Sequence, residues 1–268
     1  MDELILKTLF GSVLVVLTIA YTSGWRRLHR ADHGQSAPTW RLPLYLAGLA
    51  ALGVALLSPL DRLAEEYFSA HMVQHLLLVM VAAPLVLLGN PLAVSLWGLP
   101  RRVRRPAGRV LTRNATLRRI LGATTILPVA WLLYVGDLWI WHAPLLYEAA
   151  LQHYLVHVVE HAALFASAVV FWWPIIEPAP RLHPRVLPGF AILYLVAATG
   201  QNTFLGLLLG LPERVLYGHY LRLTARLGSD PLDDQALAGG IMWISGHMYL
   251  LPILLILWSL RDREVAHS

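Results

Sequence analysis

The sequence predicts an all-α integral membrane protein, a bundle of seven transmembrane helices with the N-terminus outside and the C-terminus cytoplasmic. Hydrophobic residues make up 57% of the 268 residues and charged residues only 14%. The mean hydropathy of +0.58 is higher than a soluble domain of this length carries. Most of the apolar residues fall in runs of about 20, the length that an α-helix needs to cross about 30 Å of hydrocarbon.

Seven apolar blocks follow one another along a single domain covering residues 1–268. In order they are roughly Leu4–Ser23, Leu42–Leu60, Phe68–Trp97, Ile120–Trp141, Tyr154–Ile176, Val186–Leu211 and Leu237–Leu260. The first block is expected to remain as a span, because acidic residues precede it and the first arginines follow it, unlike a cleaved signal peptide. Proline inside the third, fourth and seventh blocks, at Pro84, Pro128 and Pro252, is expected to kink or open those helices.

The distribution of arginine predicts which ends of the spans face the cytoplasm. Residues 99–119, between the third and fourth blocks, contain eight Arg and no acidic residue, which is typical of a cytoplasmic loop. Alternating sides outward from that loop places 16 of the 21 Lys and Arg residues inside. These loops account for the net charge of +5, so membrane lipid is an expected partner and nucleic acid is not.

Two histidine pairs with a spacing of four residues lie within apolar blocks, His71 with His75 and His157 with His161. Residues four apart share one face of a helix about 6 Å from each other, and neutral imidazole is a good metal ligand. With a rise of about 1.5 Å per residue, both pairs and His247 fall at similar depths in the outer half of the membrane. The expected metal ligands are therefore His71, His75, His157, His161 and His247.

Five more residues near these histidines are expected to extend or support the site. A carboxylate within a span needs a partner, and for Glu160 that partner is a histidine N–H or the ion itself. Met72 and Met248 adjoin site histidines and offer soft sulfur, although methionine at such positions usually packs. His142, beside two tryptophans, fits an interfacial residue better than a ligand. The additional or supporting residues are His153, Glu160, Met72, Met248 and His142.

Several kinds of chemistry are excluded by what the sequence lacks. There is no cysteine, which rules out disulfides, thiolate metal sites and iron–sulfur clusters. No Gly-rich phosphate loop, Ser-His-Asp arrangement or pair of buried carboxylates is visible, so the protein is not expected to be an enzyme. The inner halves of the spans, such as Leu85–Leu88 and Ile253–Leu257, are apolar. A metal chaperone is therefore favoured over a transporter.

Short motifs recur around the histidines and the outer loops. They are His71-Met-Val-Gln-His75, Ala83-Pro84-Leu, Gly89-Asn90-Pro91, Trp139-Ile-Trp-His142-Ala-Pro144 with Tyr147, the His153/His157/Glu160-His161 segment, and Pro231-Leu-Asp-Asp-Gln235 leading to Gly239-Gly240-Ile-Met-Trp243. In these motifs the chain resembles the polytopic CtaG-type cytochrome c oxidase assembly proteins, from about the second span to the seventh. The resemblance implies a multi-pass protein of the bacterial cytoplasmic (inner) membrane that helps to mature the haem-copper oxidase.

The resemblance also implies a cargo and a partner. The cargo would be copper, since histidine and methionine suit copper better than magnesium or calcium. The partners would be cytochrome c oxidase subunits, while the copper donor stays unknown. The expected function is thus a copper-binding assembly factor whose histidine site in the outer leaflet receives or delivers the ion.

Two other functions remain open from the sequence. A bis-His haem protein needs two facing histidines, such as His75 and His161, as axial ligands to iron. The segment His157-Val-Val-Glu160-His161 also matches the His-x-x-Glu-His pattern of inverted zinc proteases, with Glu160 as general base. Copper is preferred to zinc or haem because only the copper interpretation agrees with the longer motifs.

Overall fold

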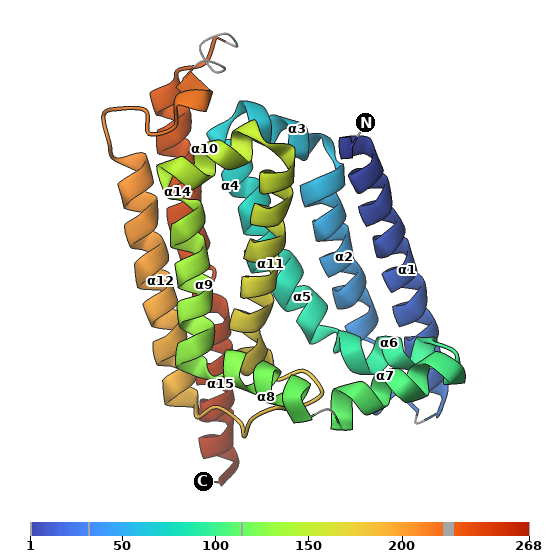
Figure 1. Ribbon diagram of the computed structural model, residues 1–268. Coiled ribbons are helices and arrows are strands. Elements are labelled where there is room, and N and C mark those ends of the chain that lie inside the picture. Colours follow the sequence, from blue (N-terminus) through green and yellow to red (C-terminus); the bar gives the residue numbers. More distant parts are fainter. Residues whose placement is uncertain (1, 32, 114, 222–227, 268) are drawn as a thin grey trace.

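The computed structural model describes residues 2–31, 33–113, 115–221 and 228–267, and every regular element in these ranges is helical (Figure 1). The elements are α1 (Asp2–Ala31), α2 (Arg41–Leu57), α3 (Pro59–Glu66), α4 (Phe68–Leu76), the π-helix η1 (Leu77–Ala82), α5 (Ala83–Leu88), α6 (Pro91–Gly98), α7 (Arg101–Arg113), α8 (Ala115–Thr124), α9 (Leu127–Trp141), α10 (Pro144–Gln152), α11 (Tyr154–Ile176), α12 (Pro188–Gly210), α14 (Pro231–His247) and α15 (Leu250–His267). The prediction of an all-helical protein is confirmed.

Among the described residues, five helical stretches are long and apolar enough to cross a membrane. They are Glu3–Ala31, Phe68–Leu88, Tyr154–Ile176, Pro188–Gly210 and Pro231–Ser259. Two bent pairs, α2 with α3 at 49° and α8 with α9 at 71°, bring the number to seven if each pair is one span. The structure therefore has five to seven candidate spans, and the fifth predicted block matches its helix at both ends.

Proline residues mark the places where the predicted spans divide into separate helices. Pro128 and Pro252 each lie in the first turn of a helix, α9 and α15, where the missing N–H costs nothing. Pro84 behaves differently, because the turn before it widens into η1 and the stretch Phe68–Leu88 remains one span. π-helical turns of this kind are frequent at functional sites, and this one directly follows the helix that carries His71 and His75.

The third span is shorter than the predicted block Phe68–Trp97. Asn90 adopts a left-handed conformation with φ of 54°, and the chain then turns into α6. This helix packs closely on α1, because a Cβ added to Gly24 would overlap the carbonyl oxygen of Val94, and one added to Gly98 would overlap that of Ala20. The close approach of α6 holds the C-terminal half of α1.

Small residues also allow α12 and α14 to pack backbone to backbone. A Cβ on Gly206 would lie 2.7 Å from the amide nitrogen of Trp243, and one on Gly239 would overlap the backbone of Gly210. Gly206 and Gly210 form the small-xxx-small pattern that brings membrane helices together.

The helices α4 and α11 lie in the middle of the bundle, whereas α1 lies at its edge (Figure 1). Only 6% of the most apolar window of α1 is buried, compared with 56% for Phe68–Leu88 and 44% for Tyr154–Ile176. The two histidine-bearing stretches are therefore the best covered of the five unbent candidate spans among the described residues.

Candidate metal centre

The first helix of the site, α4, presents His71 and His75 on one buried face. The helix begins at Phe68, where the carboxylate of Asp234 on α14 accepts hydrogen bonds from the backbone N–H of Phe68 at 2.7 Å and of Ser69 at 3.3 Å. An acidic side chain is a favourable cap for a helix N-terminus because it satisfies unpaired N–H groups and faces the positive end of the helix dipole. Asp234 thus fixes the start of α4 one turn before His71.

The second helix, α11, contributes His157, Glu160 and His161. All three side chains are buried, and Leu164, Ala168 and Phe171 continue the same buried stripe toward the C-terminal end of the helix. The spacing of three and four residues places the two histidines and the carboxylate on one face of the helix. The helix is apolar everywhere else on this face, so the polar groups form one layer.

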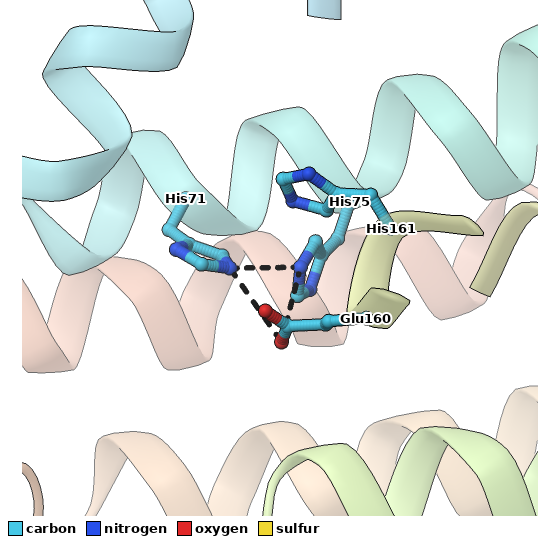
Figure 2. A group of neighbouring side chains, drawn as sticks. All are labelled: His71, His75, Glu160 and His161. Atoms are coloured by element: carbon cyan, nitrogen blue, oxygen red, sulfur yellow. Dashed lines mark hydrogen bonds and ion pairs between the residues drawn. The ribbon is translucent and has the colours of Figure 1, made fainter. Parts of the chain in front are cut away.

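Figure 2 shows how the side chains from the two helices converge. His71 Nε2 lies 2.8 Å from His75 Nε2, and Glu160 Oε1 lies 3.7 and 3.6 Å from these two nitrogens. His161 completes a group whose ligand atoms all lie within 4.8 Å of one another. Two nitrogens each bound to one ion at about 2.0–2.1 Å are at most about 4.2 Å apart, so small side-chain movements bring the four groups onto one ion.

The residues fit a bound cation because several buried polar atoms here have no hydrogen-bond partner. They are His75 Nδ1, His142 Nε2, His157 Nε2, His161 Nε2 and both carboxylate oxygens of Glu160. A buried polar atom without a partner costs about 1–3 kcal/mol, and an unpaired buried charge costs more. A cation between the imidazole nitrogens and Glu160 offsets these costs, which a purely structural cluster does not do.

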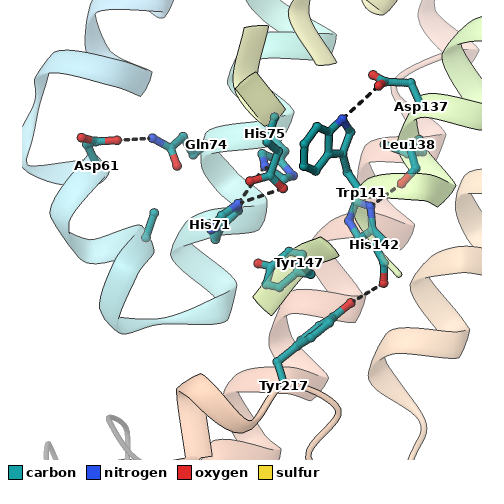
Figure 3. A network of polar contacts seen from close by, with 12 residues as sticks. Asp61, His71, Gln74, His75, Asp137, Leu138, Trp141, His142, Tyr147 and Tyr217 are labelled. Carbon is teal, nitrogen blue, oxygen red and sulfur yellow. Dashed lines mark hydrogen bonds and ion pairs between the residues drawn. The ribbon is translucent and has the colours of Figure 1, made fainter. Parts of the chain in front are cut away.

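His142 belongs to the cluster, although the sequence predicted an interfacial residue. Its ring centre lies 5.9 Å from that of His75, and its side chain is buried (Figure 3). Nδ1 donates to the carbonyl oxygen of Leu138 at 2.7 Å, so a neutral ring keeps its lone pair on the buried Nε2. Burial lowers the pKa of His142 to about 4, so the ring is neutral at physiological pH.

Aromatic side chains cover one side of the cluster, and no pattern in the sequence predicted this cover. Tyr147 stacks on Tyr217 with ring centres 4.1 Å apart, and Phe68 lies edge-on to both rings. Tyr217 donates to the backbone oxygen of His142 at 2.9 Å. Burial raises the pKa of Tyr147 and Tyr217, so both hydroxyls stay protonated.

Tyr220 sets the orientation of the His71 ring. Its hydroxyl donates to the carbonyl oxygen of Ala64 at 3.0 Å, and His71 Nδ1 lies 3.3 Å from the same hydroxyl oxygen. Because that oxygen donates elsewhere, it accepts from Nδ1–H, which leaves the lone pair of His71 on Nε2, toward the other ligands. Tyr220 was not among the residues that the sequence predicted for the site.

Another intramembrane carboxylate, Asp137, is satisfied within the protein. It accepts hydrogen bonds from Trp141 Nε1 at 3.0 Å and Ser167 Oγ at 2.7 Å. Glu160 lacks such donors. Glu160 therefore has no donor that competes with an ion for its oxygens.

His247 does not join the other predicted ligands. It is exposed, and its Nδ1 lies 3.1 Å from the carbonyl oxygen of Trp243 on the same helix. The buried stripe of α14 runs through Ala238, Met242 and Ser245, and His247 lies on another face. The prediction rested on depth in the membrane, which does not determine the direction in which a side chain points.

Three supporting residues also lie away from the converging ligand atoms. His153 is exposed at the N-cap of α11, and Met248 is 37% exposed. Met72 is buried in the hydrophobic core. Of the predicted residues, the structure therefore brings together two histidines from α4, two from α11, Glu160 and His142.

Comparison with known proteins identifies the family. The sequence model of the cytochrome c oxidase caa3 assembly factors (Caa3_CtaG) matches residues 19–262. The chain belongs to this family. It is also 29% identical, over 97% of its length, to uncharacterized proteins of Mycobacterium bovis and Mycobacterium tuberculosis, and 26% identical, again over 97%, to one of Mycobacterium leprae. The chain spans 40% of the length of each of these relatives, and no solved structure matches it.

Proposed function

We propose that the protein binds copper at His71, His75, Glu160 and His161 and supplies it for the assembly of cytochrome c oxidase. The observation that carries the proposal is the convergence of four buried ligand groups from α4 and α11. Among them, the carboxylate oxygens of Glu160 and His161 Nε2 have no hydrogen-bond partner. The family supports an oxidase-related role, and oxidase subunits are the proposed clients. His142 Nε2 is available as a further ligand.

The ligand set favours a transition metal. Imidazole nitrogens suit zinc, copper, iron and nickel, whereas magnesium and calcium prefer oxygen ligands. The role in the maturation of a haem-copper oxidase favours copper among these metals. Because the site lacks thiolate ligands, the ion can be released more readily than from a structural cysteine site, as delivery requires.

The proposed orientation places this site in the outer half of a bacterial inner membrane. The Arg-rich α7 and the C-terminus lie at one end of the bundle, and the N-terminus lies at the opposite end (Figure 1). The positive-inside rule makes the α7 end cytoplasmic. With each bent pair counted as one span, seven spans connect an outer N-terminus to an inner C-terminus.

The geometry favours neither the haem nor the protease interpretation. The general-base carboxylate of a protease must reach a peptide and a water molecule, but the side chain of Glu160 is 0% exposed behind the aromatic cover. Axial haem ligands lie on opposite faces of a flat macrocycle. Here the ring centres of His75 and His161 are 5.4 Å apart, and Glu160 lies among the same ligands.

The test is the metal content of the oxidase in cells whose assembly factor carries His161→Ala. We expect the oxidase subunits to be made but to lack copper, because the defect is in metal supply and not in synthesis. His153→Ala is the matched control, since this histidine is exposed at the N-cap of the same helix, eight residues before His161. A fully metallated, active oxidase in the His161→Ala cells would contradict the proposal.

A further inference from the structure

A cavity of about 460 Å³ lies between α1, α2 and α11, next to the metal centre. Most of its wall is apolar, made by side chains such as Phe10, Leu52 and Phe165. The polar part of the wall consists of Lys7, Asp61, Tyr154, His157 and His161. His157 and His161, both on α11, therefore line this cavity.

The cavity contains a second set of ligand atoms. Asp61, His157 and His161 each offer one ligand atom, and these atoms lie within 4.8 Å of one another. All three side chains are buried, and neither His157 Nε2 nor His161 Nε2 has a hydrogen-bond partner. Imidazole nitrogens and a carboxylate oxygen are suitable ligands for the same transition metals as the first set.

Exposure identifies the side from which an ion reaches the site. His71 and Glu160 are 0% exposed beneath the tyrosine cover, whereas His157 and His161 each keep 5%, and both line the cavity. Exposure then increases through Asp61 and Lys7 to Glu3, whose side chains are 9%, 30% and 53% exposed. A series of polar groups thus leads from the solvent to His161.

We propose that Asp61, His157 and His161 form a second, outer copper position, from which the ion moves to the buried position through the shared ligand His161. This inference rests on the proposed function and adds the route. A direct transfer between two positions that share one ligand keeps the ion coordinated throughout, so the ion is never released without ligands into the apolar interior.

Lys7 controls access to the outer position. Its Nζ lies 2.7 Å from Asp61 Oδ2 and 2.7 Å from Glu3 Oε1, so it can stay paired with Glu3 when an ion binds Asp61. Gln74 donates to Asp61 Oδ1 at 2.7 Å and holds the carboxylate in place (Figure 3). Lys7 therefore competes with the ion for one carboxylate oxygen.

The test is a titration of the full-length protein in detergent micelles with copper(I), against a colorimetric competitor chelator under anaerobic, reducing conditions. We expect two ions per chain in the unmodified protein at saturating copper, with His161 bound to one of them at a time, because a neutral imidazole has a single free nitrogen. Asp61→Asn should bind one ion, Glu160→Gln should lose the buried ion and keep the outer one, and Glu65→Gln should bind two. Glu65 is the matched control because it is an exposed acid on the same helix as Asp61.

Lys7→Met gives a readout that a loss of folding cannot imitate. Removing the competing ammonium should tighten the outer ion by about two- to fivefold, since partly exposed ion pairs are weak. Weaker binding of the outer ion in this variant would overturn the role of Lys7. One ion that is lost with Glu160→Gln and unaffected by Asp61→Asn would overturn the second position alone. No copper in the unmodified protein would overturn the proposed function as well.

Discussion

The cap that Asp234 provides for α4 should be measurable both in stability and in metal binding. In Asp234→Ala the N–H of Phe68, a residue that is 1% exposed, loses its 2.7 Å acceptor. A buried N–H without a partner costs about 1–3 kcal/mol, and the lost charge at the helix N-terminus adds about 0.3–1 kcal/mol. We expect the free energy of unfolding to fall by about 2–3 kcal/mol.

The assay is unfolding of the purified protein in detergent micelles, with the copper affinity measured on the same samples. Because α4 begins one turn before His71, a loosened first turn should also weaken copper binding. Asp234→Asn keeps one acceptor oxygen and should lose about 1 kcal/mol. The matched control is Asp233→Ala, an exposed neighbour on the same helix. Equal stability and affinity in Asp234→Ala and Asp233→Ala would refute the role of the cap.

Three other predictions follow from the site. His75→Ala and His161→Ala should each remove most of the copper from the buried position, and the double variant should be little worse in a copper titration, because ligands of one ion are not additive; independent losses would mean separate sites. The low pKa of His142, about 4 because of burial, should make the folded state lose stability as pH falls from about 6.5 toward 4, and His142→Gln should reduce this dependence in unfolding measured across that range. An impermeant chelator should remove copper from intact spheroplasts faster than from inverted vesicles; equal rates would contradict an outer site.

Much of the fold was predictable because membrane spans have a strong local signal. Length and apolar composition found the stretch Tyr154–Ile176 to the residue. The predicted boundaries of the spans were wrong where the helix ends or bends within an apolar stretch, because hydropathy does not record such changes in the backbone. The third span ended at Leu88, nine residues before the predicted end at Trp97, because the chain turns at the left-handed Asn90 into α6. The bend of 71° before α9 divided the fourth block.

The part of the site that depends on the spacing of residues along one helix was predictable. The spacing in His71/His75 and in His157/Glu160/His161 placed each set on one face, and the structure brings the two faces together. Relations between helices were not predictable in this way. The direction of His247, the burial of His142 and the cover by Tyr147, Tyr217 and Tyr220 depend on how α9, α10 and α14 pack, which a single sequence does not record.

The most direct test of copper binding is the elemental content of the purified, full-length protein together with its visible absorption spectrum. We expect copper in a defined ratio to protein, no iron, and loss of the buried ion in the Glu160→Gln variant. A red protein with a sharp Soret band and iron in place of copper would contradict the copper site, as would a protein that binds no metal when copper is supplied.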